Sequence, residues 1–437
     1  MSKWPVLKHL VQDQKAGQAA AIASICSSHP LVIEAAIDQG VQDGNIILIE
    51  ATANQVNQYG GYTGLKPADF SRMVQLIAAE RGLPADRLIL GGDHLGPLVW
   101  QKEPEDTAMA QAEELIRQYV LAGYSKIHLD ASMFLGSDPR DSKLPVQLSA
   151  DRAARLARVA ADACAVRQQE TGPDDQAPVF VIGSEVPIPG GAQEPDEILQ
   201  VTTTADLDET LRRFRAAFAS QGIASLFDQV IAVVVQPGVE FGDSTIHAYD
   251  RAAASDLVRY MRTRPSLVLE GHSTDYQRTE HLQQMAEDGV GILKVGPALT
   301  FALREGLVAL EQLEKALFPS ADADSLSHFA ATLDRVMLQK PGYWQNHYHG
   351  DEDAQRLARL FSLSDRCRYY LGEDEVAAAI DRLVHHLSGQ PIPLPLLSQY
   401  LPEQYWLVRA NQLRPEPQEL LKSKVRREIG RYPTFKG

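Results

Sequence analysis

The sequence contains few cysteines. Its 437 residues include three of them, Cys26, Cys164 and Cys367, which are widely separated and form no CxxC pair. This pattern argues against a disulfide framework and against a thiolate zinc site, and it favours a reducing compartment. We therefore expect a cytoplasmic protein.

Long apolar runs are also missing. We find no stretch of roughly 18 apolar residues, the length needed to cross a bilayer. The first residues, MSKWPVLKHLVQDQKAG, lack the continuous apolar core of a signal peptide. These absences argue against a membrane as a partner.

Positive charge is scarce relative to negative charge. The chain has 42 Lys and Arg against 57 Asp and Glu, a formal net charge of -15. Such a surface repels nucleic-acid backbones and anionic lipids, so we exclude both as partners. A sugar phosphate remains compatible, because backbone N–H groups and one or two lysines act at shorter range than the net charge.

What the sequence does contain is a repeated strand and helix pattern. Hydrophobic residues make up 44% of the chain and charged residues 23%, as in ordinary globular proteins. Eight short runs rich in β-branched or apolar residues each precede an amphipathic stretch, which predicts βα units and a parallel sheet. Eight such units close a (β/α)8 TIM barrel. The runs are 22–28, 45–51, 87–94, 125–132, 178–185, 229–236, 266–273 and 291–297.

The segments between the runs have helical patterns. Phe70 and Ile77 lie on one predicted helical face that ends before Gly82, and another helix is expected from Asp106 to before Gly123. The link at 174–215 contains PIPGGAQEPDE, and there we expect an ordered loop near the site in place of a plain helix.

The end of the chain has a different pattern from the rest. After Gly296 no further strand run occurs, and the remaining sequence has helical patterns interrupted by PGYWQNHYHG and PIPLPLLSQYLPEQYW. We predict a barrel over residues 1–310 and a helical extension over 311–437 that packs on it.

Polar residues follow nearly every predicted strand. In this type of barrel the carboxyl ends of the strands converge on one cavity. A single polar residue there could simply cap a helix, but burying so many carboxylates and imidazoles without a ligand would cost several kcal/mol. We therefore predict a binding site for a polyhydroxylated ligand. The predicted substrate-binding residues are Glu50, Asn54, Gln55, Asp130, Gln236, Ser273 and Lys294.

The segment LILGGDHLGP places an acid and an imidazole together at the end of the third strand. Two glycines allow close backbone approach there, before Asp93 and His94. With Glu185 and His272 from other strands, the set offers nitrogen and oxygen ligands for a divalent transition metal such as Zn or Mn. We predict His94, Glu185 and His272 as metal ligands. A hydrogen-bonded histidine pair is the alternative.

Two further features concern phosphate and sugar. Backbone N–H groups in GHST (271–274) and VGPA (295–298) lie where barrels commonly bind phosphate. Lys294 would add a point charge, could form a Schiff base, or could pair with Glu270. The loop EATANQVNQYGGYTG is rich in amides and hydroxyls, which suit a sugar. By contrast, histidines in NHYHG and at 385–386 are interpreted as surface or packing residues.

Several motifs together resemble one family along nearly the whole chain. They are IEATANQVNQYGGYTG, LGGDHLGP, HLDASM, GSEVPIPGG, VVQPGVEFG, LEGHSTDYQ and LKVGPALTFALREG, with FSLSDRCRYY and IPLPLLSQYLP in the tail. The chain is similar to the Z subunit of class II D-tagatose-1,6-bisphosphate aldolase (GatZ/KbaZ). The resemblance implies a (β/α) barrel, a role in galactitol, amino-sugar or related ketose catabolism, and oligomeric association with a separate catalytic aldolase subunit.

The resemblance also implies roles for residues. The Asp93–His94 pair is similar to the acid and metal-binding histidine of class II aldolases, which would make Asp93 the proton-transfer group. Where those enzymes carry further histidines, this chain has Gln236 and Glu270 with His272. A kinase label given to some members has no support from a GxxxxGK[ST] loop.

Three functions follow. In the first, the chain is an accessory aldolase subunit that supports C3–C4 aldol chemistry on a ketose or ketose phosphate. In the second, it is a self-sufficient, metal-dependent tagatose or fructose 4-epimerase that acts by retro-aldol cleavage and readdition, with Asp93 and Glu185 as catalytic residues. The third, a sugar-binding scaffold without chemistry, fits poorly with so many titratable groups.

Overall fold

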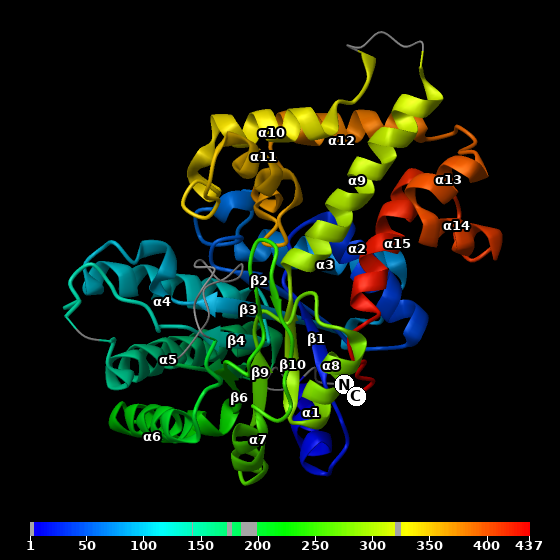
Figure 1. Ribbon diagram of the computed structural model, residues 1–437. Helices are drawn as coiled ribbons and strands as arrows, with labels where there is room; N and C mark the ends of the chain where they lie inside the picture. The colour runs from blue at the N-terminus through cyan, green and yellow to red at the C-terminus, as the bar shows by residue number, and fades with distance from the viewer. Residues whose placement is uncertain (1–3, 142, 173–176, 185–198, 320–324) are drawn as a thin grey trace.

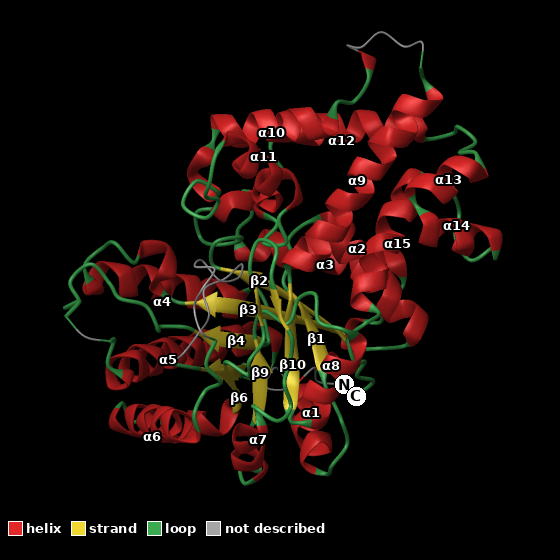
Figure 2. Ribbon diagram, in the orientation of Figure 1, coloured by secondary structure: helices red, strands yellow, loops and turns green. Residues whose placement is uncertain are grey.

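The chain forms a closed barrel of eight parallel strands surrounded by helices (Figures 1 and 2). The computed structural model describes residues 4–141, 143–172, 177–184, 199–319 and 325–437. Each of the eight predicted runs overlaps one barrel strand, so the predicted fold class is confirmed. The strands are β1 (Ile22–Ile25), β2 (Ile47–Thr52), β3 (Leu88–Leu95), β4 (Lys126–Leu129), β5 (Val179–Ile182), β6 (Val230–Val235), β9 (Val268–Gly271) and β10 (Val290–Val295).

Alternation of side chains along the strands determines what fills the barrel. Leu48, Ile89, Val181, Val234 and Ile292 belong to one buried apolar cluster, which also includes residues of the N-terminal helix. The neighbouring strand residues belong to a second, larger cluster with the surrounding helices. Because successive strand residues point to opposite faces, the first set fills the interior and the second packs outward.

The helices before the last strand cover the barrel. Gly82 ends α3 in a left-handed conformation with φ 78°, and both predicted helices, those before Gly82 and Gly123, are present. The loop expected at 174–215 is wrong over residues 204–215, because α6 begins at Thr204. Residues 174–176 and 185–198 of this segment lie outside the described residues. The helices are α1 (Trp4–Lys15), α2 (Pro30–Asp43), α3 (Pro67–Arg81), α4 (Glu105–Leu121), α5 (Val146–Thr171), α6 (Thr204–Ser220), α7 (Ser255–Arg262) and α8 (Thr279–Glu287).

A small antiparallel pair of strands was not predicted. It consists of β7 (Glu240–Phe241) and β8 (Ile246–His247), which follow β6. Two residues per strand are too few to produce an alternating pattern. Within the described ranges, no helix has both the length and the apolar composition to cross a bilayer.

The C-terminal helices form an extension beside and above the barrel (Figure 1). Its last helix joins it to the barrel, since Lys422 places its Nζ 3.1 Å from Oδ2 of Asp38 on α2. The division proposed between residues 310 and 311 falls inside α9 and stays a prediction. The helices are α9 (Pro297–Leu317), α10 (Phe329–Gln339), α11 (Glu352–Phe361), α12 (Asp374–Leu387), α13 (Leu394–Tyr400), α14 (Pro402–Arg409) and α15 (Pro417–Ile429).

Candidate functional site

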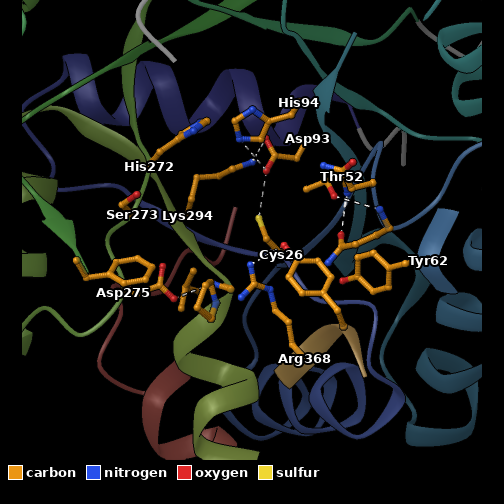
Figure 3. A pocket seen from close by; sticks show the side chains of 17 residues that line it. Cys26, Thr52, Tyr62, Asp93, His94, His272, Ser273, Asp275, Lys294 and Arg368 are labelled. Atoms are coloured by element: carbon orange, nitrogen blue, oxygen red, sulfur yellow. Dashed lines mark hydrogen bonds and ion pairs between the residues drawn. The ribbon is translucent and has the colours of Figure 1, made fainter. Parts of the chain in front are cut away.

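A pocket lies where the barrel strands end (Figure 3). It is partly open to solvent, and both polar and apolar side chains line it, as is usual in sites for small molecules. Most of the residues predicted to act in catalysis or to bind substrate or metal line it. These are Asn54, Gln55, Asp93, His94, His272, Ser273 and Lys294.

Beneath the pocket, Glu50, Lys126 and Glu270 form what we call the charged layer. The Nζ atom of Lys126 lies 2.6 Å from Glu50 Oε1 and 2.8 Å from Glu270 Oε2, and all three side chains are fully buried. These contacts are ion pairs whose angles fall outside hydrogen-bond geometry. Lys294 connects the layer to the pocket, with its Nζ 2.5 Å from Glu50 Oε2 and 2.6 Å from Asp93 Oδ1.

The local sequence makes room for this arrangement. A Cβ atom on Gly91 would come within 2.8 Å of Glu50 Cγ, so only glycine fits beside the buried carboxylate. His94 and Ser273 adopt left-handed φ angles of 47° and 53°. Non-glycine residues in this region are strained, and such strain concentrates at functional sites.

Three imidazoles, those of His94, His128 and His272, form what we call the histidine cluster. Their ring centroids are 4.9 to 5.3 Å apart. The Nδ1 atom of His94 lies 2.8 Å from Asp130 Oδ2, a carboxylate contact that fixes the orientation of the ring. The Nδ1 atom of His128 lies 3.1 Å from Asp93 Oδ1. One carboxylate therefore contacts both the histidine cluster and Lys294.

Burial and neighbouring charges set the protonation of these groups. Burial lowers the pKa of His272 to about 3, which keeps its imidazole neutral. Burial also opposes charge on His94, but the carboxylates of Asp93 and Asp130 outweigh it and raise the pKa of that histidine. For Asp93, burial is outweighed by His94 and Lys294, and the pKa stays well below its ordinary range. Asp93 is therefore a carboxylate.

The residues present fit a divalent metal. Ligand atoms of Asp93 and of the histidine cluster all lie within 4.8 Å of one another. Nε2 of His128 is buried and has no hydrogen-bond partner among the described residues. Three imidazoles form a donor set that zinc commonly uses at catalytic sites, and the Asp93 carboxylate lies beside them.

The candidate metal ligands in the structure differ in one residue from the predicted metal ligands. The structure brings His94 and His272 together, whereas Glu185 lies outside the described residues. His128 takes a place in the group that the sequence analysis did not assign to it. Its position on β4, within HLDAS, was the available signal, because this strand was already recognised as ending in polar residues.

The loop after β2 is ordered. Gln55 accepts a hydrogen bond from the Thr52 backbone N–H (2.8 Å), and the Thr63 hydroxyl donates to the Gln55 carbonyl (2.7 Å). A Cβ atom on Gly61 would lie 2.3 Å from the same carbonyl oxygen, and its φ is 56°. Glycine is therefore required for the turn that holds Asn54 and Gln55 against the pocket.

The helical extension contributes pocket residues that were not predicted from the strand ends of the barrel. Arg368 and Tyr369 line the pocket, and Figure 3 shows the Arg368 side chain extending toward Cys26. Tyr369 packs edge-on against Tyr62 of the β2 loop at 4.9 Å and stacks on Tyr343 at 4.7 Å. The segment FSLSDRCRYY carried the resemblance, and this was the signal that could have identified them.

Three residues predicted to bind substrate, Glu50, Asp130 and Gln236, are not among the residues that line the pocket. The Oε1 atom of Gln236 instead accepts hydrogen bonds from the Gly238 and Val239 backbones at 2.8 and 3.0 Å. The expected phosphate-binding N–H groups of VGPA are also engaged, because Gly296 and Ala298 donate to a carboxylate of the protein itself.

Proteins of known structure match this chain to very different degrees. A probable tagatose 6 phosphate kinase from Sinorhizobium meliloti 1021 is 44% identical, with a TM-score of 0.85 over 94% of this chain and 99% of that one. Fructose-bisphosphate aldolase (Fba) from Campylobacter jejuni is 12% identical, with a TM-score of 0.47 over 89% and 92% of the two chains. The model of the D-tagatose-1,6-bisphosphate aldolase subunit GatZ/KbaZ-like family matches residues 7–435, and the chain belongs to this family.

Proposed function

We propose that this chain supports aldol chemistry at the C3–C4 bond of a ketose, as a subunit of a class II aldolase. Membership of the family supports this role. The observation that carries the proposal is the position of Asp93, whose carboxylate contacts both Lys294 and His128 at the wall of the pocket. A bound divalent metal would polarise the ketose carbonyl and stabilise negative charge on its oxygen.

Asp93 is the residue we assign to proton transfer. In retro-aldol cleavage the C4 hydroxyl loses its proton, the C3–C4 bond breaks, and the electron pair moves toward the C2 carbonyl. Asp93 is ionised and can accept that proton, but Lys294 at 2.6 Å weakens its basicity. Substrate oxygens that attract Lys294 away would strengthen Asp93 as a base, and the same group returns the proton on readdition.

The remaining pocket residues would hold the sugar. Asn54 and Gln55 line the pocket with amide groups, and Ser273 and Arg368 add a hydroxyl and a cation. Amide and hydroxyl groups can donate and accept hydrogen bonds, which matches a polyhydroxylated chain. We assign these four residues to substrate binding.

A second candidate is a ketose 4-epimerase that needs no other protein. The observation favouring it is that a proton-transfer group, three histidines able to hold a metal and a pocket lined by polar side chains all belong to one chain. Cleavage followed by readdition to the other face of the aldehyde inverts C4, so both candidates share one site.

The test is to load the purified chain with Zn²⁺ or Mn²⁺ and incubate it with fructose, tagatose and their phosphates. Metal-dependent interconversion by the chain alone would support the epimerase, whereas cleavage only after a catalytic aldolase subunit is added would support the accessory role. Asp93→Asn should reduce the interconversion by the chain alone by about 10²- to 10⁴-fold. Full activity in this variant would contradict the assignment of Asp93.

A further inference from the structure

The junction between β10 and α9 has the form of a barrel anion site. The helix begins at Pro297, directly after Gly296, and both residues line the pocket. Backbone N–H groups at the first turn of a helix are unpaired within the helix and attract anions. In barrels this position, after the last strands, frequently holds the phosphate of a substrate.

The donors of this turn already have partners. Asp275 Oδ1 accepts hydrogen bonds from Gly296 N at 3.0 Å and from Ala298 N at 2.8 Å. Leu299 N donates to the Gly296 carbonyl at 3.0 Å, and Pro297 has no N–H to offer. Every backbone donor of residues 296–299 is therefore accounted for within the protein.

Asp275 occupies this position as a buried residue of the pocket wall. Its side chain is 2% exposed and lines the same cavity as Arg368. Figure 3 shows both residues on the side of the view away from Asp93 and His94. Burial raises the pKa of Asp275 to about 6, while the two backbone N–H groups and Arg368 favour its ionised form. At neutral pH the turn therefore holds a carboxylate that stands where a phosphate would bind.

We infer that Asp275 is a specificity-determining residue: it fills the anion cradle of α9, so the end of the ketose that reaches this cradle carries a hydroxyl group and no phosphate. The inference deepens the proposed function and rests on it for the identity of the ligand as a ketose. A phosphate would find no free N–H donor here and would meet a like charge. A sugar hydroxyl could instead donate a hydrogen bond to the carboxylate.

The experiment titrates inorganic phosphate into the metal-loaded full chain by calorimetry, for the unaltered protein and for Asp275→Ala. We expect no saturable binding to the unaltered chain. The alanine variant frees the Gly296 and Ala298 donors and removes the charge, so its phosphate affinity should rise by about 100-fold or more. Fructose should compete with the phosphate that the variant binds.

Asp275→Asn is the matched control, because its amide oxygen can still accept both hydrogen bonds. It should bind phosphate at least about tenfold more weakly than the alanine variant. If the alanine variant fails to fold, as judged by circular dichroism, Asp275→Ser replaces it, since its shorter side chain also leaves both donors free.

Two results would overturn the inference: phosphate binding by the unaltered chain that fructose displaces, or a folded alanine or serine variant that gains no phosphate binding. The titration does not depend on turnover. A chain that converts no ketose would therefore contradict the proposed function while leaving the role of Asp275 to be decided by phosphate alone.

Discussion

The charged layer and the histidine cluster lie next to each other at the end of the barrel. Both contain buried polar atoms without a hydrogen bond among the described residues, but those of the charged layer form ion pairs. In the charged layer, Lys126 lies within 2.8 Å of two carboxylates, and all three side chains are fully buried. In the histidine cluster, Nε2 of His128 is buried without a hydrogen-bond partner among the described residues.

This difference separates a supporting element from a binding element. Buried charges persist only when opposite charges compensate them, and the charged layer meets that condition within the protein. A buried imidazole nitrogen without a partner costs free energy unless a ligand engages it. We therefore expect the charged layer to support the barrel end and the histidine cluster to bind an ion. The predictions below test this distinction.

The largest effect should come from breaking the charged layer. Lys126→Met leaves Glu50 and Glu270 buried without their shared cation, so we expect a loss of about 3–5 kcal/mol in the free energy of unfolding. Urea denaturation followed by circular dichroism measures it. Lys340→Met is the control, because it removes a lysine that pairs with Glu373 at the surface, and it should leave the unfolding midpoint unchanged. Equal stability of the two variants would contradict a supporting role for the layer.

The histidine cluster should respond in metal binding more than in stability. His94→Ala and His128→Ala each remove a ligand, so we expect affinity for Zn²⁺ to fall by at least about 100-fold, measured by competition with a chelator. His386→Ala is a control, since His386 pairs with Glu314 outside the cluster. If His128→Ala retains full affinity while His94→Ala loses it, His128 is a packing residue.

Much of the barrel and part of the site could be predicted from sequence. The alternation of apolar runs and amphipathic stretches gave all eight strands, because parallel strands in a barrel are buried on both faces and form continuous apolar runs. The Asp93–His94 pair was identifiable for a related reason: strand ends converge in any barrel, so polar residues there gather whatever their separation in sequence.

The remaining features depend on tertiary geometry that leaves no local pattern. Lys126 lies inside a strand, and nothing near it in sequence indicates that Glu50 and Glu270 flank it. Arg368 lies far beyond the last strand and reaches the pocket only because the extension folds back. Likewise, the N–H groups of VGPA indicated a phosphate site, and only coordinates reveal that Asp275 fills it.

Asp275 gives a pH-dependent test of the distinction between supporting and binding elements. Burial raises its pKa from 3.8 to about 6, so the folded chain holds this proton to higher pH than the unfolded chain does. The resulting stability is present below pH 4 and is lost as the pH rises through 6. At pH 7, Asp275→Asn should therefore be more stable than the unaltered chain by up to about 3 kcal/mol.

The measurement is the difference in free energy of unfolding between the two proteins from pH 4 to pH 8. It should grow between pH 4 and pH 6 and then become constant. A difference that is the same at every pH would show that Asp275 ionises equally in the folded and unfolded chains. Asp275 would then lower the stability of the protein at neutral pH. Such a cost is typical of residues that are kept for binding or catalysis.

The smallest effect concerns the contact between the extension and the pocket. The Tyr369 hydroxyl accepts a hydrogen bond from Arg368 Nη2 at 2.9 Å, so Tyr369→Phe should cost about 1 kcal/mol in stability and raise KM several-fold with kcat unchanged. Tyr405→Phe removes a similar bond to Arg409 on the exposed surface of α14 and should change neither quantity. If Tyr369→Phe lowers kcat and leaves KM constant, the extension affects the chemical step. The view that it acts only in substrate binding would then be wrong.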